Sequence, residues 1–202
     1  MVILADKSEL YRGDEMRTDI INYLKNEVYL KCQRSVNRFG IGVYYHIEAV
    51  AKNAELLADK YGADKEIVII AAWLHDIASI IDYNLYELHH IHGARIADEI
   101  LTEFGYEKHK IIIVQECIRN HRGSVRNSRV TLEELCVADA DAISHFDSIP
   151  SLLYLAYINK NMGIEDGKIF VKNKLERSYQ KLSEESKSYY ANKFQNAMSF
   201  LK

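Results

Sequence analysis

The sequence predicts an all-α fold, and three features indicate it. Stretches of helical length carry apolar residues at 3.6-residue spacing, while the period-two alternation typical of strands is almost absent. Glycines stand between these stretches, and Pro150 is the single proline. With 202 residues, 48% hydrophobic and 27% charged, the chain suits one globular domain with a helical bundle as its core.

The apolar stripes predict the helices in chain order. The first runs over about residues 14–36, and the second, over about 44–61, stops at Gly62, a residue type common just after a helix C-terminus. Asp64 is a suitable N-cap for a central helix that extends to Ala78. Further helices are expected over about 89–104, 107–120, 131–146 and 150–163, followed by a helical pair over 166–202. A capping-box pattern at Thr131 opens the helix over 131–146.

The chain divides into three parts of one domain. We interpret residues 1–43 as an N-terminal helix that packs on the bundle, 44–147 as the core, and 148–202 as a C-terminal helical extension. The extension alternates charges with Leu and Tyr and shows no catalytic constellation. It is therefore interpreted as surface helices that close the core or meet a partner subunit, as in a homodimer.

The cysteines and the charge balance indicate the compartment of the protein and the kinds of partner it contacts. Cys32, Cys117 and Cys136 are odd in number and widely spaced, as expected of free thiols in a reducing compartment. The first residues lack the apolar segment of a signal peptide, and no apolar run approaches membrane-spanning length. The net charge of −3 argues against a broad nucleic-acid-binding face. We expect a cytoplasmic protein that contacts neither membrane nor nucleic acid.

Imidazoles and carboxylates interrupt three of the apolar stripes. His46 opens one of them, His75 and Asp76 end the most apolar run of the chain, and Asp139 and Asp141 interrupt a third. Burying a carboxylate is costly unless it is paired or bound to a metal. Two imidazoles and two carboxylates, one of them from the Asp139/Asp141 pair, suit a divalent ion of Mn, Fe, Co, Ni, Zn or Mg.

These residues resemble a known family signature. His46, the segment Ala71-Ala-Trp-Leu-His-Asp-Ile and the Ala-Asp-Ala-Ile around Asp141 are similar to the H…HD…D pattern of the HD-domain metal-dependent phosphohydrolases. The resemblance covers about residues 44–146. It implies a helical bundle that holds one divalent metal, or two, with His46, His75, Asp76 and Asp141 as ligands. Periodicity alone favours Asp139 as the inward residue, so Asp139 is kept as a residue that supports the site or contacts substrate.

Further polar residues resemble those of some branches of the family. His89, near a Gly-Ala helix start, and His121, at the end of the next helix, are similar to two additional histidines of those branches. The resemblance implies that they bind a second metal or act on a phosphate as acid or electrophile. The remaining candidates for contact with substrate are His90, Arg122 and, in the loop that follows, Arg126 and Arg129.

The resemblance implies hydrolysis of a phosphate ester in a small, nucleotide-like molecule. The metal would polarise a phosphoryl oxygen and activate a bound water, which Asp76 would orient or deprotonate. His89, His121 and Arg122 would compensate the phosphate charge. Two alternatives stay open: an HD-fold protein that binds a nucleotide or signal molecule without turnover, and a helical interaction module that uses its C-terminal extension.

Overall fold

The computed structural model describes residues 16–122 and 129–201, and within these ranges every regular element is a helix, as predicted. The first elements are α1 (Thr18–Cys32), α2 (Gly42–Tyr61), α3 (Lys65–Leu74), α4 (Ile77–Ile81) and the 3₁₀-helix η2 (Tyr83–Leu88). The later ones are α5 (His89–Glu103), α6 (Lys108–Asn120), α7 (Leu132–Asp147), α8 (Ile149–Tyr154), the π-helical turn η3 (Leu155–Asn159), α9 (Ile164–Gln180) and α10 (Glu184–Ser199).

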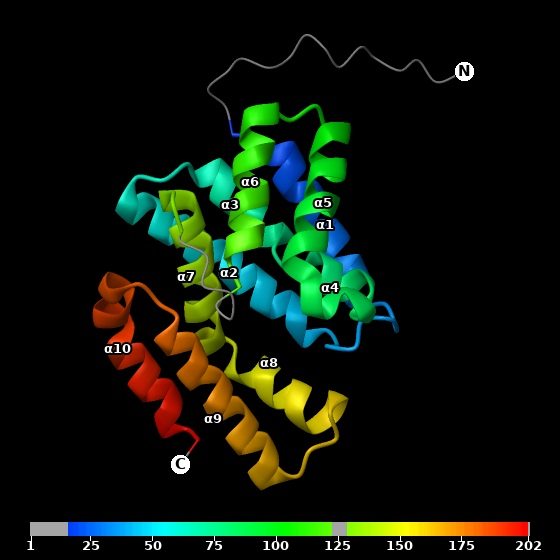
Figure 1. Ribbon diagram of the computed structural model, residues 1–202. Coiled ribbons are helices and arrows are strands. Elements are labelled where there is room, and N and C mark those ends of the chain that lie inside the picture. The colour runs from blue at the N-terminus through cyan, green and yellow to red at the C-terminus, as the bar shows by residue number, and fades with distance from the viewer. Residues whose placement is uncertain (1–15, 123–128, 202) are drawn as a thin grey trace.

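Helix α3 forms the centre of the bundle. Every residue from Glu66 to Leu74 is buried, and α3 packs against α1, α2, α6 and α7. Helix α2 in turn packs extensively against α7, and α5 pairs with α6. Helices α8, α9 and α10 lie together at the end of the molecule away from α5 and α6 (Figure 1). In the described part of the chain, no helix combines the length and the apolar character that crossing a bilayer requires.

Most predicted helix ends agree with the structure. Gly62 follows α2 with a positive φ of 78°, which a residue with a side chain rarely adopts. The Asp64 side chain accepts a hydrogen bond from Ile67 N at 3.1 Å, and the Thr131 hydroxyl accepts one from Glu134 N at 3.2 Å. The first helix is shorter than predicted, because α1 begins at Thr18 and ends at Cys32.

The central helix differs from its prediction at the His75–Asp76 pair. Instead of continuing to Ala78, α3 ends at Leu74 and α4 begins at Ile77. Asp76, between them, has φ −107° and ψ 10°, outside the helical range. The His75 ring explains the break, because its Nδ1 lies 2.7 Å from Ala72 O. In an uninterrupted helix that carbonyl would accept from the amide of Asp76.

The stretch predicted as one helix over 150–163 is also divided. Helix α8 ends at Tyr154, the π-helical turn η3 follows, and Asn161 has a positive φ of 51°. Together these features reverse the chain so that α9 runs back along α8. The reversal places α9 against α7, where α9 reaches the candidate site.

The three cysteines are buried and form no disulfide. Burial raises the pKa of the Cys32 thiol to about 12, so this side chain is protonated at neutral pH and acts as a small apolar group. Cys117 and Cys136 lie on the facing sides of α6 and α7, and burial raises the pKa of both. Free thiols are what the odd count and wide spacing predicted.

Candidate metal centre

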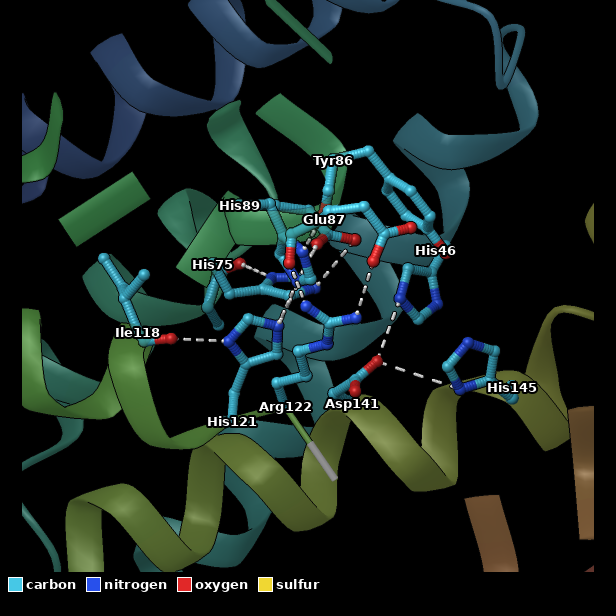
Figure 2. Close-up of polar contacts among 12 residues, drawn as sticks. His46, His75, Tyr86, Glu87, His89, Ile118, His121, Arg122, Asp141 and His145 are labelled. Carbon is cyan, nitrogen blue, oxygen red and sulfur yellow. Dashed lines mark hydrogen bonds and ion pairs between the residues drawn. The ribbon is translucent and has the colours of Figure 1, made fainter. Parts of the chain in front are cut away.

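Three of the four residues of the predicted metal set line one cavity, and the fourth, His75, is fully buried next to Asp76. His46 projects from α2, His75 from the end of α3 and Asp141 from α7 (Figure 2). Asp76 lies between α3 and α4. His46 Nε2 lies 3.2 Å from Asp141 Oδ1, and His75 Nε2 lies 3.5 Å from Asp76 Oδ2. His46, His75 and Asp76 each offer one ligand atom, and these atoms lie within 4.8 Å of one another.

One imidazole nitrogen in this set fits a metal ligand directly. His75 Nε2 is buried, lies 3.5 Å from Asp76 Oδ2 and has no hydrogen-bond partner among the described residues. The His46 nitrogen that faces Asp141 is Nε2. A buried nitrogen without a partner is costly, and a metal ion would remove that cost. His75 also shows the hydrogen bond typical of a metal-binding histidine, because its other nitrogen bonds the backbone carbonyl of Ala72. The residues present therefore fit a divalent cation.

The two carboxylates remain ionised in this setting. Burial alone would raise the pKa of Asp76, but the nearby His75 outweighs it and holds that pKa well below its usual value. Burial likewise opposes ionisation of Asp141, and Lys181 with His46 lowers its pKa well below the usual value. Both side chains can thus act as anionic ligands at neutral pH.

His89 and His121 form a second group around Asp76. His89 Nε2 lies 3.4 Å from Asp76 Oδ1, His121 Nε2 lies 3.9 Å from the same oxygen, and the two Nε2 atoms are 3.2 Å apart. Each ring is held by its Nδ1, which lies 2.7 Å from Tyr86 O in His89 and 2.7 Å from Ile118 O in His121 (Figure 2). Burial, with His75 and His89 nearby, lowers the pKa of His121 to about 3. We assign the His121 proton to Nδ1, so that its Nε2 lone pair faces Asp76.

The structure places Asp139 and Asp141, the two alternatives for the fourth metal ligand, in different surroundings. Asp141 faces the cavity, whereas Asp139 is fully buried and faces away from it. Ser183 N donates to Asp139 Oδ1 at 3.1 Å, and Arg129 lies 3.4 Å from the same oxygen. Periodicity correctly indicated that Asp139 points inward, but its partners are the α9–α10 turn and Arg129. Asp139 does not line the cavity in which we expected it to contact substrate.

The other substrate-contact candidates are placed differently from one another. Arg122 lines the cavity and donates to the Glu87 carbonyl. His90 is buried with its ring 5.7 Å from that of His89, but it does not line the cavity. Arg129 binds Asp139 and the Lys181 carbonyl instead of facing the cavity. Arg126 lies outside the described residues.

Sequence reasoning missed His145. Its Nδ1 lies 3.8 Å from Asp141 Oδ1 and 3.3 Å from the Ser178 hydroxyl, and its ring lies 4.5 Å from that of His46. Together with His46 and Asp141 it forms a third group whose ligand atoms lie within 4.8 Å of one another. The signal was present, because residues four apart on a helix share a face.

The cavity above these residues has a volume of about 590 Å³ and two contrasting walls. One wall is aromatic and includes Phe39, Tyr83 and Tyr86, in which the two tyrosine rings stack with centroids 5.7 Å apart. The opposite wall is basic and comes from the C-terminal extension, in which no catalytic group had been expected. Its cationic side chains are those of Lys160, Lys174, Arg177 and Lys181.

This all-helical bundle brings buried imidazoles and carboxylates together from three helices. Such a group of side chains has the features of a divalent-metal site. The sequence model of the HD domain matches residues 43–145. The chain therefore belongs to the HD-domain superfamily of metal-dependent phosphohydrolases, as the resemblance implied.

Two relatives align with about half of the chain. An uncharacterized protein of Clostridium beijerinckii is 32% identical over 107 residues, which are 52% of this chain and 66% of that protein. Ribonuclease Y of Enterococcus faecalis is 32% identical over 106 residues, which are 52% of this chain and 18% of that enzyme. The similarity thus spans only part of either relative.

Solved structures share the fold at lower identity. A crystal structure described as a predicted HD superfamily hydrolase, from an uncultured Thermotogales bacterium, has a TM-score of 0.54 and 22% identity, covering 79% of this chain and 85% of that one. YpgQ of Bacillus subtilis, solved in complex with ADP, has a TM-score of 0.63 and 17% identity, covering 90% and 93%. At these identities the likeness concerns the fold alone.

Proposed function

We propose that this protein hydrolyses a phosphate ester of a small, nucleotide-like molecule, with a divalent cation held by His46, His75, Asp76 and Asp141. The observation that carries the proposal is the position of His46, which forms one close group with His75 and Asp76 and another with Asp141. The buried Nε2 of His75 has no hydrogen-bond partner in the described chain. A cation bound there would supply Lewis acidity and a water of lowered pKa.

Asp76 is the side chain best placed to orient the attacking water. Its Oδ2 lies near His75, while its Oδ1 lies near His89 and His121. At 23% exposure, its side chain is the most accessible of this group. A carboxylate in this position can accept a proton from a water that faces the cavity.

His89 and His121 support a second cation better than a direct contact with phosphate. In neutral rings whose Nδ1 donates to a backbone carbonyl, the two Nε2 atoms, which lie 3.2 Å apart, present lone pairs to each other. Two lone pairs repel each other, and they would also repel a phosphoryl oxygen. A cation shared with Asp76 Oδ1 would satisfy both nitrogens.

The aromatic wall supports a substrate that contains a flat ring. Tyr83 and Tyr86 stack nearly parallel, with an interplanar angle of 6°, and Phe39 lies 5.5 Å from Tyr83 and 5.4 Å from Tyr86. Aromatic side chains that line a cavity favour contact with a flat ring such as a base. The ADP complex of the structural neighbour YpgQ also supports a nucleotide-like ligand in this fold.

The test is hydrolysis of generic phosphomonoesters and a nucleotide panel with Mn, Co, Ni or Mg added, on the full chain and on Asp76→Ala. Asp76→Ala should lose the metal and reduce turnover by more than about 100-fold, since a ligand is lost, while circular dichroism shows intact helices. The matched control is Asp98→Ala, which removes an exposed carboxylate on α5 and should behave like the parent. Metal-dependent nucleotide binding without turnover would favour the non-catalytic alternative, and turnover retained in Asp76→Ala would contradict the assignment.

A further inference from the structure

Helix α9 presents a stripe of cationic side chains to the cavity. Lys174, Arg177 and Lys181 are spaced three and four residues apart, so they lie on one face of the helix together with Ser178. On the neighbouring face, Val171, Leu175 and Leu182 are buried in the core. The apolar contacts therefore fix which face of α9 turns toward the cavity.

The end of the stripe nearest the metal centre is anchored to α7 at two points. The Lys181 ammonium contacts Asp141 Oδ2, while Oδ1 of the same carboxylate faces His46. Two residues further on, Ser183 donates to the buried Asp139. Lys181 thus lies beside the candidate metal centre. Lys174 is close enough to the centre for Asp141 and Asp76 to act on its pKa, and Arg177 lies between the two lysines along the chain.

The other two cations of the stripe have no counter-ion among the described residues. Neither Lys174 nor Arg177 forms an ion pair there, whereas Lys168 of the same helix pairs with Glu165 at 3.4 Å. Burial, with Lys181 and Arg177 nearby, lowers the pKa of Lys174 despite the opposing effect of Asp141. Adjacent cations that line a cavity without a carboxylate partner are suited to bind an anion, because a bound anion would relieve their repulsion.

We infer that Lys174 and Arg177, with Lys181, bind a second phosphate group of the substrate, beyond the one that lies at the metal centre. The inference rests on the proposed function and narrows its substrate to molecules with a diphosphate or a longer phosphate chain. Lys181, already paired with Asp141, lies between the two phosphate positions. Arg177 is suited to bidentate contact with phosphate oxygens, and Lys174 adds a point charge.

The test compares two ligands that resist hydrolysis, α,β-methylene-ADP and the 5′-phosphonate analogue of AMP, by isothermal titration calorimetry. We compare the metal-supplemented full chain with Lys174→Ala/Arg177→Ala. The matched control is Lys172→Ala, an exposed lysine of the same helix that does not line the cavity. The double variant should bind α,β-methylene-ADP at least about tenfold more weakly, as expected for loss of charge-assisted hydrogen bonds. Its affinity for the monophosphonate should change less than about twofold, because no contact to a second phosphate exists there to be lost.

Several outcomes would overturn the inference. An equal loss of affinity for both ligands would mean a general electrostatic effect, and unchanged affinity for α,β-methylene-ADP would mean that α9 does not contact it. Failure of the parent protein to bind α,β-methylene-ADP would also count against the inference. Metal content and phosphomonoester turnover are measured on the same samples of the parent protein. If the parent contains metal and hydrolyses phosphomonoesters but does not bind α,β-methylene-ADP, the inference about a second phosphate fails while the proposed function stands. Metal content should persist in the double variant, because none of the proposed metal ligands is changed.

Discussion

His46 Nε2 and Asp141 Oδ1 lie 3.2 Å apart and join α2 to α7 at the floor of the cavity. The two helices pack extensively against each other, so the site is a product of the core packing as much as of its polar residues. Asn53, further along α2, donates to the Ser144 hydroxyl at 2.8 Å and to Asp147 at 3.0 Å on α7. These contacts fix the register that brings His46 to Asp141.

Asp139→Asn should destabilise the protein and loosen the α9–α10 turn. The Asp139 carboxylate is fully buried and accepts from Ser183 and Arg129, and Asn keeps only part of this accepting capacity. We expect a loss of about 1–3 kcal/mol in the free energy of unfolding, measured with urea, as for a hydrogen bond to a buried charge. Asp98→Asn, at an exposed position on α5, is the control and should be neutral. Equal stability of the two variants would contradict the role given to Asp139.

Glu66→Gln should remove a pH-dependent part of the stability. Burial alone would raise the pKa of Glu66, but Lys110 at 2.9 Å, Arg17 N at 2.6 Å and the Tyr106 hydroxyl at 2.7 Å outweigh it and lower that pKa. A carboxyl whose pKa is lower folded than unfolded stabilises the fold above its unfolded pKa and loses that contribution as pH falls through the folded value.

The measurement is urea unfolding of the parent and Glu66→Gln between pH 7 and pH 3. At pH 7 the variant should be less stable by about 1–3 kcal/mol, since a buried hydrogen-bonded charge is lost. The difference should narrow as the pH falls below about 4.3, the usual value for an unfolded Glu. A difference that stays constant across this range would show that the charge of Glu66 does not contribute.

Gly167→Ala should be destabilising, against the usual trend for a helical glycine. Alanine normally stabilises a helix interior by about 1 kcal/mol relative to glycine. At Gly167, however, an added Cβ would lie 2.2 Å from Tyr157 Cε1 and 2.7 Å from Cδ1, so the ring or α9 must shift. We expect a net loss of about 1–3 kcal/mol in thermal or urea unfolding. The matched control is Gly163→Ala, where nothing lies within 4 Å of the added atom; an equal effect at both positions would refute the steric argument.

The sequence predicted the helices and the cavity floor because each carried a strong local signal. Gly62, Asp64 and Thr131 mark helix ends through backbone chemistry that acts over a few residues. His75 and Asp76 were noticed because polar groups at the end of a very apolar run must be paired or bound. The choice between Asp139 and Asp141 was harder, because α7 is buried on nearly all sides and helical periodicity no longer separates an inner from an outer face.

The basic wall could not be predicted in the same way. Charged residues at helical spacing are usually a solvated surface, and the stripe of Lys174, Arg177 and Lys181 looks no different in sequence. Its orientation depends on the chain reversal after α8 and on the contacts of α9 with α7, which are tertiary. The break between α3 and α4 was missed for a related reason. The break arises because the His75 ring bonds the Ala72 carbonyl, which would otherwise accept a helical hydrogen bond. Apolar periodicity carries no information about such a side-chain contact.

The most direct measurement is the metal-to-protein ratio, by elemental analysis of protein purified without chelator. The parent chain should contain about one divalent ion or more, and His46→Ala should contain almost none, because it loses a ligand that α2 alone supplies. The control is His109→Ala, which removes an exposed histidine on α6 and should keep the metal. Added Mn, Co, Ni, Zn or Mg should raise the Tm of metal-depleted parent protein but not that of His46→Ala. A metal-free parent whose Tm does not respond to any of these ions would contradict the account.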